Sequence, residues 1–228
     1  LSYTVGSTQQ DVPIQDLIKG NPLDVDGDGQ MELLIVRRGD AITCLNPSLL
    51  EHVILDLYKW DKSSQQFLVA DNWTLQMSFS QFVVGCSASE ISAFYSKVSE
   101  AVMVGDVNGD HLSDILIADV DANPIDIHVL YSDGETYKFS NIFLLGQLPA
   151  LLNGLKPTIF TQDIHGDGKS DLALTAHDAS SNHVYFRFYP TVGDFLGFPS
   201  VTSDIVSRFG GSIGDFDGDG TLDYLTQL

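Results

Sequence analysis

The sequence predicts an all-β fold built from repeated four-stranded units, and three observations lead to this prediction. Four acidic segments of nine residues fit one template, D-x-[D/N/H]-G-D-x-x-x-[D/E]. Short runs of apolar and β-branched residues bracket these segments, as is typical of buried strands. Two further alternating stretches follow each of the first three segments. Four-stranded antiparallel units repeated roughly every 50 residues are typical of the blades of a β-propeller.

The acidic segments define the repeat. We name them loop 1 (24–32), loop 2 (106–114), loop 3 (163–171) and loop 4 (215–223), and number their positions 1 to 9. Their starts lie 82, 57 and 52 residues apart, so the first interval carries an insertion. We expect this insertion between Gly39 and Glu100, where residues 87–100 form either a short helix or an extended excursion.

Each acidic loop is expected to join the first two strands of a unit. First strands are predicted at 101–104, 158–160 and 209–213, and second strands at 33–36, 115–118, 172–175 and 224–226. The outer two strands are predicted at 52–58 and 67–75, at 125–131 and 137–145, and at 183–189 and 194–201.

We interpret the whole chain, residues 1–228, as one propeller segment with about four blades' worth of sequence. The predicted parts are the outer strands of a preceding blade (1–18, with strands at 1–5 and 12–18), a blade with the insertion (19–100), two blades (101–156 and 157–208) and half a blade (209–228). Most rings need more sequence than this, so we expect part of a larger ring, for example a seven-bladed one. Alternatively, the two half-blades pair and close a small ring.

The spacing of acids in the loops predicts a cation site. Carboxylates at alternate positions of a tight Gly-bearing loop converge, and Ca²⁺ suits such a flexible cage of carboxylates and carbonyls. An EF-hand would need Glu at position 12 and flanking helices. Position 12 is Ile35, Ile117, Leu174 or Thr226, and the flanks are strand-like, so the EF-hand is excluded. The remaining alternative is a metal-free turn, since Asp and Gly also dominate hairpin turns.

These loops resemble the FG-GAP or VCBS-type repeats of integrin-α-like β-propellers. Phe209-Gly210 before loop 4 matches the "FG" element, and Gly105 and Gly214 fall where the family has Gly-Asp. The resemblance covers nearly the whole chain at the level of the repeat. It implies calcium bound between the first two strands of each blade, through side chains at positions 1, 3, 5 and 9 and the carbonyl at position 7.

The resemblance implies a ligand set for each loop. In loops 1 and 2 the ligands are Asp24, Asp26, Asp28, Glu32 and the Gln30 carbonyl, then Asp106, Asn108, Asp110, Asp114 and the Leu112 carbonyl. In loops 3 and 4 they are Asp163, Asp167, Asp171 and the Lys169 carbonyl, then Asp215, Asp217, Asp219, Asp223 and the Thr221 carbonyl.

Two histidines depart from the family's pattern. His165 replaces the oxygen ligand at position 3 of loop 3 with an imidazole, a poor partner for a hard cation. His111 stands at position 6 of loop 2, where Gly favours the sharp turn. We therefore expect up to four Ca²⁺ ions, with loops 1 and 4 the strongest sites, loop 2 slightly weakened and loop 3 the weakest.

The charge excludes several classes of partner. The chain carries 11 basic and 31 acidic residues, a net charge of −20, and 14 of the acids lie in the four loops. Four Ca²⁺ ions would leave a net charge of about −12, which still repels nucleic acid and anionic membranes.

No run of the sequence approaches the roughly 18 consecutive apolar residues of a membrane span. Because extracellular calcium is millimolar and matches the affinity of extracellular modules, we expect a secreted or cell-surface protein.

Several other features have two interpretations. Cys44 and Cys86 are either free thiols or a disulfide. Asn72-Trp-Thr74 is a glycosylation sequon, whereas its proline excludes Asn46-Pro-Ser48. Arg38-Gly39-Asp40 is interpreted as a strand end and turn rather than an adhesion ligand.

The aromatic residues and histidines outside the loops are assigned structural roles. Trp60, Trp73 and Tyr58 are predicted to be core residues rather than a platform for sugars. His128 and His183 are interpreted as ordinary face residues of alternating strands.

These observations favour a non-catalytic scaffold that recognises a protein or a glycan through loops on a propeller face. Among the loops, the insertion is the strongest candidate for the ligand face. The sequence has no G-x-S-x-G, H-E-x-x-H or phosphate-loop motif, and a carboxylate committed to calcium is a poor general acid. Two alternatives remain: the propeller portion of a larger secreted enzyme or toxin (a hydrolase, a lyase or a shell component), and a spacer with no ligand.

Overall fold

The computed structural model describes most of the repeat-bearing part of the chain. The described residues are 2–5, 8–11, 24–38, 52–78, 89, 93, 96–97, 100–119, 125–144, 157–178, 183–192, 195–196, 205–207, 211–220 and 223–226. They form strands β1 to β17, which confirms the all-β fold class. Among these residues, no helix has the length and apolar character that crossing a membrane requires.

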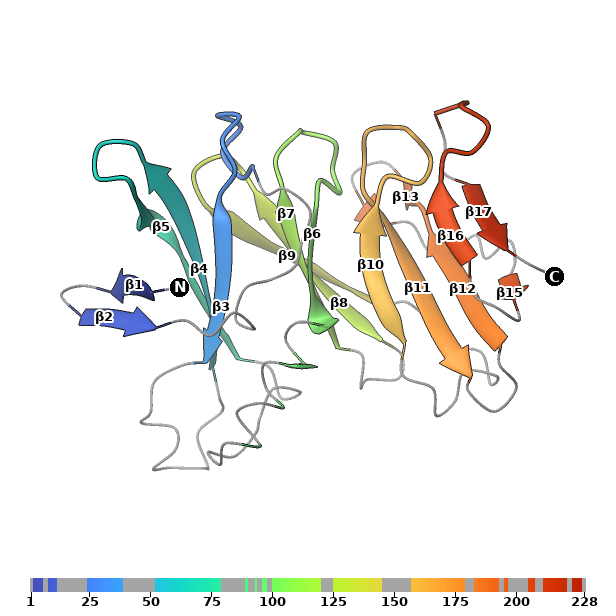
Figure 1. Cartoon of the computed structure of the whole chain (residues 1–228), viewed down its shortest axis with the longest axis horizontal. Coiled ribbons are helices and arrows are strands. Elements are labelled where there is room, and N and C mark those ends of the chain that lie inside the picture. The colour runs from blue at the N-terminus through green and yellow to red at the C-terminus, as the bar shows by residue number, and fades with distance from the viewer. Residues whose placement is uncertain are drawn as a thin grey trace.

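Three antiparallel sheets make up most of the fold, and in each the strands pair in chain order. The first sheet contains β3 (Leu33–Arg38), β4 (His52–Asp61) and β5 (Gln66–Ser78). The second contains β6 (Val102–Gly105), β7 (Asp114–Asp119), β8 (Asp126–Ser132) and β9 (Tyr137–Leu144). The third contains β10 (Thr158–Gln162), β11 (Asp171–Asp178), β12 (His183–Tyr189) and β15 (Ile205–Ser207). Figure 1 shows the three sheets side by side along the long axis, with loops 1 to 4 at the same edge, uppermost in that view.

Three pairs of short strands complete the described structure. They are β1 (Ser2–Val5) with β2 (Thr8–Asp11), β13 (Thr191–Val192) with β14 (Phe195–Leu196), and β16 (Gly211–Gly214) with β17 (Asp223–Thr226). The third pair flanks loop 4 in the same way that β6 and β7 flank loop 2. The predicted position of the acidic loops between the first two strands is therefore confirmed for loops 2, 3 and 4.

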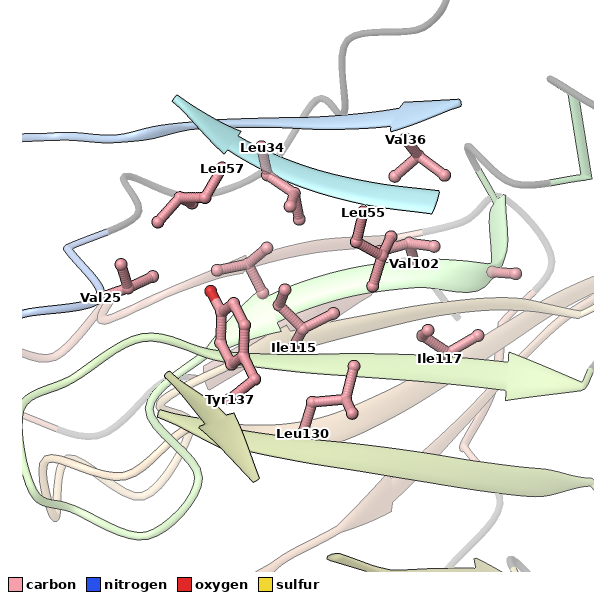
Figure 2. Close-up of a cluster of buried hydrophobic side chains, with 12 residues drawn as sticks. Val25, Leu34, Val36, Leu55, Leu57, Val102, Ile115, Ile117, Leu130 and Tyr137 are labelled. Atoms are coloured by element: carbon pink, nitrogen blue, oxygen red, sulfur yellow. The ribbon is translucent and has the colours of Figure 1, made fainter. Parts of the chain in front are cut away.

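The core lies between neighbouring sheets and follows from the alternation of strand side chains. On β7, Ile115 and Ile117 pack towards the first sheet, whereas Leu116 and Ala118 pack towards the third. All four side chains are fully buried, so the second sheet is covered on both faces. Figure 2 shows the first of these interfaces, where residues of β3 and β4 meet residues of β7 and β8, and Tyr137 from β9.

One strand prediction in the third sheet needs correction, and one at the start of the chain is not tested. The fourth strand of the third sheet is 205–207, not the predicted 194–201. Residues 195–196 instead pair with 191–192. At the start of the chain, β1 pairs with β2 at residues 8–11. The strand predicted at 12–18 lies outside the described residues.

The first interval gains part of its extra length from long strands. β4 and β5 have 10 and 13 residues, whereas β8 and β9 have 7 and 8. Of the predicted helix or excursion at 87–100, the described residues Ser89, Ala93, Ser96, Lys97 and Glu100 are helical. Cys44 and Cys86 lie outside the described residues.

The predicted roles of the aromatic residues hold only in part. Tyr58 is buried, as predicted, but Trp60 is 44% exposed, so its assignment to the core is wrong. Trp60 lies near the end of β4, opposite the exposed Phe67 of β5, with ring centroids 5.1 Å apart. Strand alternation puts Tyr58 and Trp60 on one face, but only Tyr58 lies where other side chains cover that face.

Candidate metal centre

The aspartate at position 1 folds all four loops in the same way. Its Oδ1 accepts a hydrogen bond from the N–H at position 4, and its Oδ2 accepts one from the N–H at position 6. In loops 1 and 2 these pairs are Asp24 with Gly27 (2.8 Å) and Gly29 (3.0 Å), and Asp106 with Gly109 (2.6 Å) and His111 (2.8 Å). In loops 3 and 4 they are Asp163 with Gly166 (2.8 Å) and Gly168 (2.9 Å), and Asp215 with Gly218 (2.6 Å) and Gly220 (3.1 Å). The carboxylate thus serves as a template for the backbone of the turn.

Positions 4 and 6 adopt left-handed backbone conformations, which explains their glycines. Loops 1, 3 and 4 have Gly at both positions, with φ between 69° and 89°. Loop 2 differs because its position 6 is His111, which takes a φ of 68°. A side chain in this region costs about 1–2 kcal/mol relative to the right-handed conformation. The sequence-based prediction of a less favourable turn in loop 2 agrees with this geometry.

The acid at position 9 closes each loop from inside the protein. One oxygen accepts a hydrogen bond from the N–H at position 2, over 2.9 to 3.0 Å, in all four loops: Glu32 from Val25, Asp114 from Val107, Asp171 from Ile164 and Asp223 from Phe216. Asp114 and Asp171 are completely buried. Their second oxygen accepts the N–H of Ser132 (2.9 Å) or Thr191 (2.8 Å), at or just beyond the end of the third strand. Position 9 therefore joins the loop to the third strand of its sheet.

Burial changes the ionisation of these acids. Desolvation raises the pKa of Asp114 to about 7, although the N–H groups of Ser132 and Val107 favour the charged form. Desolvation likewise raises the pKa of Glu32 above its usual value, against the hydrogen bond from Val25. A cation beside either carboxylate would favour the charged form that burial disfavours.

Positions 3 and 5 point towards the backbone of the loop tip. Oδ1 of Asp26, Asn108 and Asp217 accepts the N–H at position 5 over 2.9 to 3.3 Å. Oδ1 of Asp28, Asp110 and Asp167 accepts the N–H at position 7 over 2.7 to 3.0 Å. The side chains at position 5 are exposed in all four loops. Thr221, the predicted carbonyl ligand of loop 4, lies outside the described residues.

Two loops bring three acids into one cluster. Asp24, Asp26 and Glu32 in loop 1, and Asp215, Asp217 and Asp223 in loop 4, each offer a carboxylate oxygen within 4.8 Å of the others. These are positions 1, 3 and 9 of the predicted ligand sets, whereas the position-5 acids Asp28 and Asp219 are not in the clusters. The donors are all oxygens and the local charge is negative, so these residues fit a hard cation such as Ca²⁺.

Loops 2 and 3 have weaker donor sets. In loop 2, Asn108 supplies an amide in place of the third carboxylate. In loop 3, the ring of His165 packs against Phe188, with centroids 4.8 Å apart, and its Nδ1 lies 3.3 Å from Asp171 Oδ2. Loop 3 therefore lacks an oxygen at position 3, and an exposed imidazole lies beside its position-9 acid.

Successive loops are hydrogen-bonded to one another, which the sequence analysis missed. The N–H of Ser113, at position 8 of loop 2, donates to the Asp24 carbonyl of loop 1 over 2.8 Å. The N–H of Ser170, at position 8 of loop 3, donates to the Asp106 carbonyl of loop 2 over 2.5 Å. Ser113 Oγ also accepts the N–H of Asp24 over 3.0 Å. Serine at position 8 of both loops was the available sequence signal.

In loops 2 and 3, the residue at position 7 packs on the glycine at position 4 of the preceding loop. A Cβ built on Gly27 would lie 3.1 Å from the Leu112 side chain, and one on Gly109 would lie 2.8 Å from Lys169. These glycines are therefore needed both for their φ and for contact between loops. Loops 1, 2 and 3 therefore form a connected row along one edge of the sheets.

Lys59 of β4 is a further residue that the sequence analysis did not assign to a site. Its Nζ donates to Asp26 Oδ2, at position 3 of loop 1. Desolvation lowers the pKa of Lys59, and the charge of Asp24 opposes that shift. An ammonium group thus already neutralises part of the acidic cluster of loop 1.

A scan against protein-family models and a search of curated proteins returned no match for this chain. The relation to FG-GAP or VCBS repeats therefore stays a prediction based on the loop residues themselves.

The left-handed His111 gives the first prediction. His111→Gly should stabilise the protein by about 1 kcal/mol, because it removes a side chain from a disfavoured backbone region. Chemical denaturation in the absence of calcium measures the effect. The matched control is Gly168→Ala at position 6 of loop 3, where φ is 85° and a new Cβ meets no atom within 4 Å. This control should destabilise by a similar amount, and a loss of stability in His111→Gly would contradict the argument.

Proposed function

We propose that this chain is a calcium-stabilised β-propeller segment of the FG-GAP or VCBS type, which serves as an extracellular scaffold for binding a protein or a glycan. One observation carries the proposal. Four loops of common geometry lie at one edge of consecutive antiparallel sheets, and two of them gather three carboxylate oxygens within 4.8 Å. Such a gathering of like charge suits a divalent cation with oxygen ligands.

The arrangement of the sheets supports the propeller part of the proposal. The second and third sheets each have four antiparallel strands, with the acidic loop between the first two. The second sheet packs on the first with one face and on the third with the other. Propeller blades have this strand order and packing. The same backbone hydrogen bond, from position 8 of one loop to position 1 of the preceding loop, joins loop 2 to loop 1 and loop 3 to loop 2. A repeated contact between successive units is what radial repetition of blades would produce.

The surface near loop 1 supports binding as the function. Trp60, Phe67 and Leu68 are 41–47% exposed on the hairpin formed by β4 and β5, within the interval that carries the insertion. Exposed aromatic residues of this kind provide contact area for proteins and stacking faces for sugars. The loop acids are engaged with backbone N–H groups, which favours a structural role for them over acid–base catalysis.

Calcium should raise the stability of the folded chain. An ion that binds only the native state adds about 2.7 kcal/mol per site at a hundredfold excess over its Kd. Thermal melting with Ca²⁺, with Mg²⁺ and with a chelator measures this, and Ca²⁺ should give the highest midpoint. Equal midpoints with Ca²⁺ and with chelator would rule out the calcium assignment.

The third loop should gain affinity when its missing oxygen is restored. His165→Asp supplies a carboxylate at position 3, so we expect one additional Ca²⁺ or a clearly tighter weak site in calorimetric titration. His177→Asp is the matched control, since it places the same charge on an exposed part of β11 outside the loops. An equal change in both variants would mean that overall charge, rather than the loop, determines binding.

The aromatic pair should determine partner recognition. Trp60→Ala should reduce capture of a glycan or surface protein by about tenfold or more, because an exposed aromatic anchor commonly carries a large share of binding energy. Glycan arrays and binding to intact cells identify and measure the ligand. Leu225→Ala, on the exposed side of β17, is the control for loss of an exposed apolar side chain elsewhere. Unchanged capture by Trp60→Ala would place the ligand face elsewhere.

A further inference from the structure

Lys59 distinguishes loop 1 from loops 2 and 3, the two other loops whose sheets have a described third strand. It follows Tyr58, which pairs across the strands with Leu33, the residue directly after position 9. From this place its Nζ reaches Asp26 Oδ2, with 32% of the lysine side chain and 18% of the aspartate side chain exposed. The ammonium group thus contacts one member of the three-acid cluster of loop 1.

The strand register identifies the equivalent residues in the other sheets. Ile115 and Leu172 follow position 9 of loops 2 and 3, and they pair with Leu130 and Tyr189. The residues that correspond to Lys59 are therefore Tyr131 and Pro190, neither of which carries an ammonium group. Among the three described sheets, the lysine therefore occurs only beside loop 1, where it has a role that loops 2 and 3 do not share.

The charges in loop 1 put Lys59 and a divalent cation in competition. Asp26 Oδ2 already accepts the ammonium group, and the same carboxylate belongs to the oxygen set that fits Ca²⁺. A monovalent and a divalent cation about 4 Å apart repel each other enough to weaken binding by about tenfold or more, even with the screening of bulk water.

We propose that Lys59 is an internal counter-ion of loop 1, which neutralises its acidic cluster in the absence of calcium and is displaced when the ion binds. This inference rests on the proposed calcium function. It gives the lysine two opposite effects: stabilisation of the calcium-free loop and a lower calcium affinity of loop 1. Lys59 would then shift the filling of loop 1 to a higher calcium concentration than this loop would need without the lysine.

The experiment compares the wild-type chain with Lys59→Met, which keeps an aliphatic stem and removes the charge. Both tryptophans of the chain, Trp60 and Trp73, lie on β4 and β5. Tryptophan-sensitised luminescence of Tb³⁺, a calcium substitute, therefore reports mainly on loop 1, and Ca²⁺ can be titrated by its displacement. Melting with chelator and with Ca²⁺ is measured in parallel.

Lys59→Met should bind Tb³⁺ and Ca²⁺ about tenfold more tightly at this site. It should also melt at a lower temperature than wild type with chelator and gain more from calcium. Lys59→Gln should behave in the same way, whereas Lys59→Arg should keep the weak affinity. Lys138→Met is the matched control. Lys138 of β9 forms an ion pair of 2.6 Å with Asp133, which lies in the turn between β8 and β9 and outside the acidic loops. Its loss should therefore not shift the midpoint of the calcium titration.

The outcomes separate the two proposals. One outcome is that wild type and Lys59→Met have equal midpoints in the calcium titration while calcium raises the melting temperature of both. This result would overturn the role of Lys59 but would agree with the calcium function. Weaker binding in Lys59→Met would also overturn that role, since the lysine would then support the site. A failure of calcium to stabilise either protein would overturn the calcium function and the inference that rests on it.

Discussion

The buried carboxylate at position 9 is the interaction on which the loops and sheets depend most. It accepts the N–H at position 2 and so closes the loop, and in loops 2 and 3 it also holds the third strand through Ser132 or Thr191. Hydrogen bonds to a charged acceptor are stronger than neutral ones. They offset part of the cost of burying Asp114 and Asp171 completely. A change of conformation in any loop would therefore also disturb the sheet beneath it.

The same dependence extends from one sheet to the next. Hydrophobic contact between sheets is non-directional and fixes their distance better than their offset. Directional bonds add the offset: Ser132 Oγ donates to the Val25 carbonyl, and Thr161 Oγ1 donates to the Val104 carbonyl over 2.6 Å. Together with the Ser113 and Ser170 bonds between loops, they lie close to the loop edge. The hydrophobic core thus supplies most of the free energy that holds the sheets together, and the hydrogen bonds near the loops align one sheet with the next.

The sequence predicted the local features well, because a nine-residue loop and its flanking strands are determined by nearby residues. Aspartate at position 1 and glycine at positions 4 and 6 encode the turn, and alternation encodes the strands. Features that depend on residues distant in sequence were missed. The bond between Ser113 and Asp24 spans 89 residues, and the pairing of Lys59 with Asp26 depends on the register of β4 against β3. The exposure of Trp60 was mispredicted for the same reason, since strand alternation assigns a face but not what covers it.

These connections bear on how one site affects its neighbours. The carboxylates that fit a cation are the ones that hold the loop backbone, and position 1 also offers its carbonyl to the next loop. A cation bound in loop 1 therefore changes the charge around the Asp24 group that Ser113 contacts, and Ser113 directly precedes the position-9 acid of loop 2. Any coupling between two such sites is reciprocal, because each site changes the affinity of the other by the same factor. A difference between sites, such as the lysine beside loop 1, would therefore act on the neighbouring loop as well as on its own site.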